Sequence, residues 1–356
     1  MTTYNTKQNV EETQDDAAAT GGESSKPTRR RRFSVPLGGP FVGLIVMVVA
    51  LSFLSPYFLT VRNISNVLSQ ISDIGIMAAG AFLVILIGGI DLSVAAVMAV
   101  SMMVTGYLYA NQGWPFPLAL IAGLSVGALV GLVNGMLVTY GKVQAFVATL
   151  ATMSACQGLA LLITNGNTIN GFPTWFGKLT SFDFYHVPLQ ALLLAAVFLV
   201  LAFWLRYRPN GRALYAIGGN DEVARLSGLP VKRLKILAFV IASSLAVVSG
   251  WINISTLDSA QPTAGSGYLL NIIAIVVIGG ASLAGGSGSM GGTFIGLLIV
   301  GVLNNGMSLL HVNPNLQPVV IGAVILAAVL SDRNWLAQVQ SGLLGRLGRK
   351  ARRQET

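Results

Sequence analysis

The sequence has very little charge for its length. Only 10% of its 356 residues are Asp, Glu, Lys or Arg, whereas a soluble domain carries about 25%. Between Asn63 and Gly141 only Asp73 and Asp91 are charged, and between Ile236 and Ser331 only Asp258 is. This composition argues against a soluble globular protein. Continuous apolar stretches of this length predict membrane-spanning helices rather than alternating strands.

Cysteine and histidine are also scarce, which excludes several kinds of site. Cys156 is the only cysteine, so the chain can form no internal disulfide and no thiolate metal site. His186 and His311 lie far apart near the ends of apolar stretches, where we expect interfacial side chains rather than metal ligands. The sequence has no G-x-x-x-x-G-K-S/T phosphate loop and no Ser/His/Asp or Glu-x-x-His arrangement. We therefore expect no catalysis, no cofactor and no metal in this chain.

The net charge of +9 does not indicate binding to nucleic acid, because the lysines and arginines form short clusters between and outside the apolar stretches. The predicted fold is an all-α integral membrane protein with about ten transmembrane helices. The predicted spans are Gly38–Phe58, Ile71–Ile87, Leu92–Tyr109, Pro117–Tyr140, Ala145–Thr164, Pro188–Trp204, Ile236–Thr256, Tyr268–Leu283, Gly291–Leu310 and Leu316–Leu330.

The same pattern divides the chain into three regions. Residues 1–32 are polar, lack the apolar segment of a signal peptide and are expected to be disordered. Residues 33–332 form the membrane domain, and residues 333–356 form a basic tail. If both termini lie in the cytoplasm, 20 of the 22 lysines and arginines fall on the inner side and only Arg62 and Lys178 fall outside. The excess of inner positive charge predicts this orientation.

The long basic stretch 206–235 lies inside in this topology and has the signals of a short helix. Asn220 can cap the helix, Asp221 and Glu222 suit its positive end, and Gly228 followed by Pro230 would end it. A short amphipathic helix here could lie on the bilayer surface or fit a groove in a cytosolic partner. A solvated basic loop that only sets the orientation is the simpler alternative.

Several neutral amides lie inside the predicted spans. Amides suit a path for a neutral polyhydroxyl solute because each one both donates and accepts hydrogen bonds, but they equally suit hydrogen bonds between helices. The candidates for a solute path are Asn134, Gln157, Asn304 and Asn305. Asp91 is an ionisable group beside a membrane helix, which is often functional, but an acidic cap for the third helix is the favoured interpretation.

Five motifs occur together and in order: Gly88–Ser93, Gln144–Leu150, Gly219–Leu229, Ser259–Gly265 and Leu303–Met307. This combination resembles the membrane permeases of bacterial ABC importers for monosaccharides, those of the ribose type in particular. The likeness runs from about residue 63 to residue 332. Family members commonly have Tyr-Glu-Leu-Asp where this chain has Tyr268-Leu269-Leu270-Asn271, and the loss of two carboxylates leaves the exact sugar open.

The resemblance implies a permease subunit of the bacterial inner membrane, paired with a second permease copy, a cytosolic ATPase and a periplasmic sugar-binding protein. It implies that the cytosolic ATPase subunit hydrolyses ATP, which agrees with the missing phosphate loop in this chain. It also implies that the 219–229 motif is a coupling helix that docks into the ATPase. The implied coupling residues are Gly219, Asn220, Asp221, Glu222, Ala224, Arg225, Ser227 and Gly228.

Other functions remain as alternatives. ABC permeases for autoinducer-2 or a polyol share the general pattern. An ion-coupled secondary sugar transporter would need carboxylates deep in the membrane, and Asp73, Asp91 and Asp258 all lie near the ends of predicted spans. A membrane-embedded enzyme is disfavoured because no reactive constellation is present, and a structural membrane protein would show no dependence on a solute.

Overall fold

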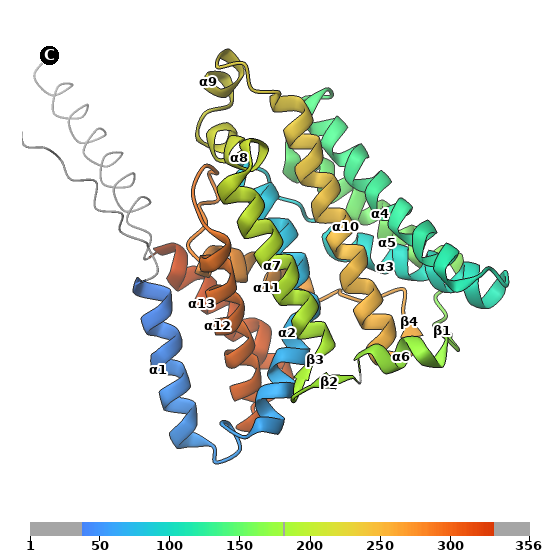
Figure 1. The fold of residues 1–356 in the computed structure, drawn as a ribbon, viewed down its shortest axis with the longest axis vertical. Coiled ribbons are helices and arrows are strands. Elements are labelled where there is room, and N and C mark those ends of the chain that lie inside the picture. Colours follow the sequence, from blue (N-terminus) through green and yellow to red (C-terminus); the bar gives the residue numbers. More distant parts are fainter. Residues whose placement is uncertain (1–37, 181, 331–356) are drawn as a thin grey trace, which may run out of the picture. The chain divides into compact units, whose positions relative to one another are not determined.

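The protein is described by a computed structural model that covers residues 38–180 and 182–330. Helices occupy each of the predicted spans (Figure 1). These helices are α1 (Gly38–Leu54), α2 (Val61–Leu86), α3 (Val94–Gly106, continued by η1, Tyr107–Asn111), α4 (Phe116–Thr139), α5 (Ala145–Ile163), α7 (Leu189–Tyr207), α10 (Val231–Leu257), α11 (Tyr268–Ile278), α12 (Met290–Leu309) and α13 (Gln317–Leu330). The predicted tails, residues 1–32 and 333–356, lie outside the described residues.

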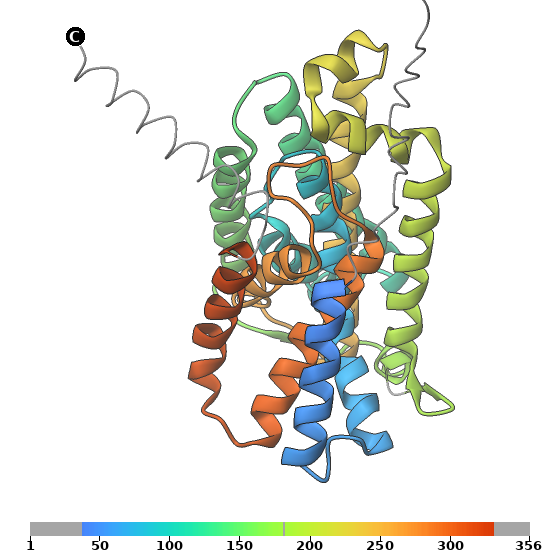
Figure 2. The same ribbon diagram turned by 90° about the vertical axis from the view of Figure 1, so that its left-hand side faces the viewer.

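The helices differ in their capacity to cross a bilayer. Within the described residues, seven helical stretches are long and apolar enough to do so, whereas α1, α11 and α13 are shorter. A span needs about 20 residues, and α11 has only 11. Figure 2 shows α1 beside α12, against which it packs. Helix α11 is therefore too short to cross the bilayer by itself, whereas α1 and α13 adjoin residues outside the described part of the chain.

Short elements lie on two opposite sides of the helices. On one side, α8 (Pro209–Gly219) and α9 (Asp221–Leu226) follow α7 (Figure 1). On the other side lie α6 (Thr174–Thr180) and two small antiparallel sheets. The sheets pair β1 (Ile169–Asn170) with β4 (Ser259–Ala260) and β2 (Asp183–Phe184) with β3 (Val187–Pro188), and η2 (Pro314–Leu316) precedes α13.

The core lies around α10, which packs against both α2 and α3. Every residue of α2 from Gly75 to Leu86 is buried. Close packing depends on a row of glycines on α4, spaced four residues apart so that they share one face of the helix: Gly123, Gly127, Gly131 and Gly135. A Cβ atom at Gly131 would lie 2.6 Å from the carbonyl oxygen of Phe239 on α10. Small residues at such contacts let membrane helices approach closely.

Candidate functional site

The helix predicted in the basic loop is present as α9. The Asn220 side chain accepts a hydrogen bond from the Val223 N–H at 3.0 Å, which caps the first turn. Asp221 and Glu222 lie in that turn, where the positive end of the helix favours negative charge. The chain leaves the helix at Gly228, whose φ of +79° is a left-handed conformation that suits glycine. The local sequence thus determines both ends of this short helix.

The inner face of α9 is fixed to the membrane domain. The Lys235 ammonium on α10 donates to the Asp221 carboxylate at 2.8 Å. Ala224 is buried, and its carbonyl oxygen accepts from the Leu229 N–H at 3.2 Å. The Ser227 hydroxyl donates to the Val223 carbonyl at 2.8 Å. The ion pair ties α9 to α10, and the other two hydrogen bonds lie within α9 and the turn that follows it.

The end of α8 is packed even more tightly against the central helix α2. A Cβ atom at Gly218 would overlap the Leu86 carbonyl oxygen and the Gly286 nitrogen. The Gly286 N–H donates to the same Leu86 oxygen at 2.8 Å. Gly219, by contrast, has no atom near its missing Cβ. Three segments therefore meet at backbone contact: the end of α8, the end of α2 and the loop 279–289.

The outer face of α9 is open and mixed in character. Val223 is 57% exposed and Leu226 is 73% exposed. On the same short helix, Glu222 and Arg225 form an ion pair whose side chains are both about two-thirds exposed. The hydrogen bond from Arg225 lowers the pKa of Glu222 below its ordinary value. An exposed apolar pair beside fixed charges is typical of a surface that a partner covers.

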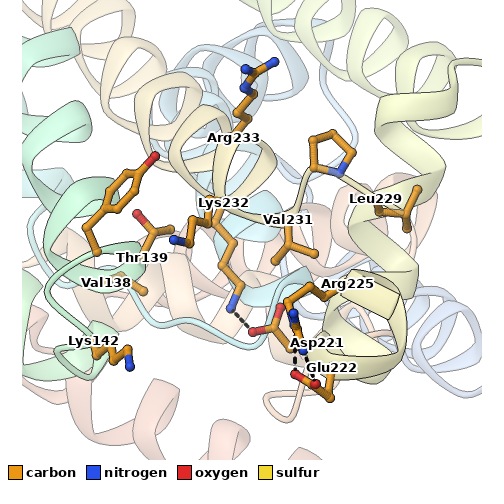
Figure 3. Close-up of a pocket in the computed structure, with 13 residues that line it drawn as sticks. Val138, Thr139, Lys142, Asp221, Glu222, Arg225, Leu229, Val231, Lys232 and Arg233 are labelled. Carbon is orange, nitrogen blue, oxygen red and sulfur yellow. Dashed lines mark hydrogen bonds and ion pairs between the residues drawn. The ribbon is translucent and has the colours of Figure 1, made fainter. Parts of the chain in front are cut away.

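A groove of about 550 Å³ opens beside α9 (Figure 3). It lies between the end of α4 and the α9–α10 connection. Lys232 sits over the Tyr140 ring, with its ammonium 4.7 Å from the ring centroid. The lining residues are Val138, Thr139, Tyr140, Lys142, Asp221, Glu222, Arg225, Leu229, Pro230, Val231, Lys232, Arg233 and Lys235. Asp221, Glu222 and Arg225 of α9 line this groove, so the groove adjoins the exposed face of α9.

Two of the four predicted solute-path amides form hydrogen bonds between helices. Asn134 is fully buried, donates to the Ser93 hydroxyl at 2.9 Å and accepts from the Thr152 hydroxyl at 2.8 Å. Asn305 exchanges two hydrogen bonds with Asn63, at 2.8 and 2.9 Å. Because these amides are engaged by protein groups, the geometry favours a packing role for both.

The other two amides are less constrained. Gln157 lies on the exposed face of α5. Asn304 is half-buried beside a cavity of about 40 Å³ between α2, α11 and α12, and its Oδ1 atom has no partner among the described residues. Neither described cavity is lined by more than one of the four amides. The structure therefore does not gather the four into one site.

Two aspartates differ in position from the sequence expectation. Asp91 was expected to cap the third helix, but the cap residue is Ser93; Asp91 accepts from the Ser93 N–H at 2.8 Å and from its hydroxyl at 2.6 Å. Asp73 was expected near a span end, but it is the thirteenth of the 26 residues of α2. The error arose because the first turns of α2 are amphipathic and carry polar residues, which hid the helix start.

At mid-helix, the Asp73 carboxylate accepts a hydrogen bond from the Tyr268 hydroxyl at 2.9 Å. This contact joins α2 to the first residue of α11. Sequence reasoning missed the pair because its members are 195 residues apart. The available signal was the position of Tyr268, which lies shortly after the Ser259–Gly265 motif.

Comparisons with known proteins agree with this architecture. Residues 63–329 match the family described as branched-chain amino acid transport system / permease component. The chain is 46% identical to the ribose import permease protein RbsC of Bacillus subtilis, over 83% of this chain and 92% of the relative. It is 38% identical to the D-allose transport system permease protein AlsC of Escherichia coli, over 83% and 91%. It is 34% identical to the xylose transport system permease protein XylH of Escherichia coli, over 85% and 96%. No solved structure matches the chain significantly.

Proposed function

The chain belongs to the branched-chain amino acid transport system / permease component family, and from that premise we propose that it is the membrane permease subunit of a ribose-type monosaccharide importer. The support comes from relatives that align over most of both chains and are named for ribose, D-allose and xylose. The sequence has no phosphate loop, which fits ATP hydrolysis on a separate cytosolic subunit. A periplasmic sugar-binding protein and a second permease copy complete the proposed assembly in the inner membrane.

We propose α9 as the helix that couples this permease to its ATPase. The observation that carries the proposal is the combination of an open outer face with an attachment to α8 and α10. Val223, Leu226 and the Glu222–Arg225 pair are exposed, and α9 follows directly on an α8 end that touches the Leu86 backbone. A force applied to α9 therefore acts on the inner end of α2. The coupling set remains Gly219, Asn220, Asp221, Glu222, Ala224, Arg225, Ser227 and Gly228.

The experiment compares Arg225→Glu with a charge swap, Glu222→Arg/Arg225→Glu. Both are assayed for ATPase co-purification and for D-ribose uptake in a strain that lacks the native gene. An arginine at the centre of an interface contributes strongly to binding, so we expect Arg225→Glu to lower co-purification at least about tenfold. The swap restores the ion pair within α9, but the positive and negative charges on the exposed face remain exchanged in position. It should therefore stay defective if Arg225 meets the partner.

The matched control is Arg62→Glu, because Arg62 is an exposed arginine at the opposite end of the domain, in the first turn of α2. This variant should keep normal ATPase co-purification. Normal co-purification and uptake in Arg225→Glu would refute the coupling role. Full rescue by the swap would show that the ion pair only stabilises α9.

The position of Asp73 gives one reason to test secondary transport as well. A carboxylate at mid-helix is what ion coupling commonly uses, and Asp73 lies halfway along α2. Sugar uptake by proteoliposomes that contain this chain alone, abolished by an ionophore, would favour that alternative. Uptake that requires ATP and a co-purified ATPase would exclude it.

A further inference from the structure

The segment that joins β4 to α11, residues 261–267, is non-helical although it lies between the two ends of the long helices (Figure 1). Its lower boundary is set by β4, where Ala260 packs against Gly106 of α3. Its upper part reaches Gly265, where a Cβ atom would lie 2.9 Å from Met98 Cε and 3.5 Å from Ala95 Cβ. At 1.5 Å per residue, the distance along α3 from Gly106 to Ala95 is about 16 Å. The segment therefore penetrates about half of a hydrocarbon core that is about 30 Å thick.

The end of the segment is held at mid-depth by side chains. Tyr268, the first residue of α11, donates to Asp73 halfway along α2 at 2.9 Å. The Asn253 amide of α10 also interacts with this carboxylate. The Oδ1 atom of Asn253 is buried and has no partner among the described residues. A carboxylate, a phenol and an amide thus meet where α11 begins.

Irregular backbone at this depth is tolerated only where protein buries it or where it lines a water-filled cavity. Protein does not bury all of this segment, because Thr263, Ser266 and Gly267 are exposed in the chain. No hydrogen bond from the Thr263 or Ser266 hydroxyl occurs within the described residues. Gln261 is half-buried, and its amide reaches only the Ser259 hydroxyl, at 3.5 Å. The segment therefore presents polar groups that are free to bind a ligand.

We propose that residues 261–267 form a binding site on the sugar path, where Gln261, Thr263 and Ser266 bind the hydroxyl groups of a monosaccharide. Two hydroxyls and an amide provide both donors and acceptors, as a neutral polyol requires. They carry no charge, so binding is weak enough for the solute to leave again. Asp73 acts as a positioning residue, because it holds Tyr268 and with it the end of the segment. This inference rests on the proposed transport function and gives a role to the Ser259–Gly265 motif.

The first test removes the two hydroxyls with little change in shape. Thr263→Val, Ser266→Ala and the double variant are assayed for D-ribose uptake at subsaturating sugar in cells that lack the native gene. A neutral hydrogen bond contributes about 1 kcal/mol, so each single variant should lower uptake about 3- to 10-fold. Thr263→Ser keeps the hydroxyl and should retain most of the uptake. ATPase co-purification should be unchanged in all of them.

The matched control is Ser125→Ala. Ser125 is an exposed hydroxyl on α4 that already donates to the Ile121 carbonyl of its own helix at 2.8 Å. Its loss should not alter uptake. The proposed binding site would be refuted if the Thr263→Val/Ser266→Ala double variant showed normal uptake in cells where the wild-type chain transports ribose. The proposed transport function would then remain intact. Absence of wild-type uptake for ribose, D-allose and xylose would overturn both.

A direct measure of access completes the test. Thr263→Cys is placed in a Cys156→Ala background, since Cys156 is the only native cysteine, and labelled with a small maleimide in membranes. We expect labelling that D-ribose slows. If the thiol introduced at position 263 stays unlabelled in the assembled transporter, a second copy covers the segment and the proposal is overturned.

Discussion

The reciprocal amide pair between Asn63 and Asn305 offers a quantitative test of whether these amides stabilise the fold or contact the solute. Each side chain donates to the other, at 2.9 and 2.8 Å, between the start of α2 and the end of α12. Hydrogen bonds between membrane helices contribute about 0.6 kcal/mol each on average, and about 1.7 kcal/mol at most. Two such bonds predict a coupling free energy of about 1 kcal/mol, and no more than about 3 kcal/mol.

The perturbation is a double-mutant cycle with Asn63→Leu, Asn305→Leu and both together, since leucine has the same side-chain branching as asparagine and no polar atoms. Asn63 also donates to the Phe58 carbonyl at 2.9 Å. Its replacement should therefore cost about 1 kcal/mol more than that of Asn305. The free energy of unfolding is measured in mixed detergent micelles, and the cycle isolates the coupling between the two residues.

The matched control is Asn304→Leu, one position away on the same helix. Asn304 has no side-chain hydrogen bond among the described residues, so it should show no coupling to Asn63. If the pair only joins helices, Asn305→Leu should keep ribose uptake per folded molecule within about twofold of wild type. A coupling near zero, together with lost uptake at unchanged stability, would refute this reasoning and return Asn305 to the solute path.

Two further predictions concern packing and topology. Gly131→Val should abolish or strongly reduce the folded fraction in detergent size-exclusion profiles. The reason is that a Cβ atom at this position would lie 2.6 Å from Phe239 O and 2.8 Å from Val240 Cα. The control Gly43→Val on α1, where no atom lies within 4 Å of the added Cβ atom, should leave the profile unchanged. Reporter fusions to residues 1–32 and to residues 333–356 should both give the cytoplasmic signal expected from the positive charges; an external signal from either would contradict the predicted topology.

The overall architecture could be predicted because hydropathy along the chain reports continuous apolar length directly. Each predicted span contains a helix, and α9 forms where Asn220 and Gly228 mark its ends. Both signals are local: a run of apolar residues, or a cap and a turn residue at fixed spacing. The family resemblance used the same local motifs and is confirmed by the match over residues 63–329.

The roles of the polar residues could not be predicted, because they depend on partners far away in sequence. Asn305 has the same chemistry as Asn304, but only Asn305 meets Asn63, 242 residues distant. The depth of Asp73 was wrong because a hydropathy window starts α2 ten residues late, after its amphipathic first turns. Sequence periodicity gives the faces of a helix; it does not give which neighbour occupies each face.

The contacts in the structure offer a physical route by which the proposed coupling helix α9 would act on the proposed sugar-binding segment. The end of α8 touches the Leu86 backbone without space for a Cβ atom at Gly218, so a displacement of α8 and α9 moves α2. Helix α2 is buried from Gly75 to its end and packs against α10, which limits local bending. The motion therefore reaches Asp73, whose hydrogen bond to Tyr268 ties α2 to the start of α11. Residues 261–267 are joined by separate turn hydrogen bonds rather than by a continuous helical ladder, so we expect this segment to accommodate such a displacement.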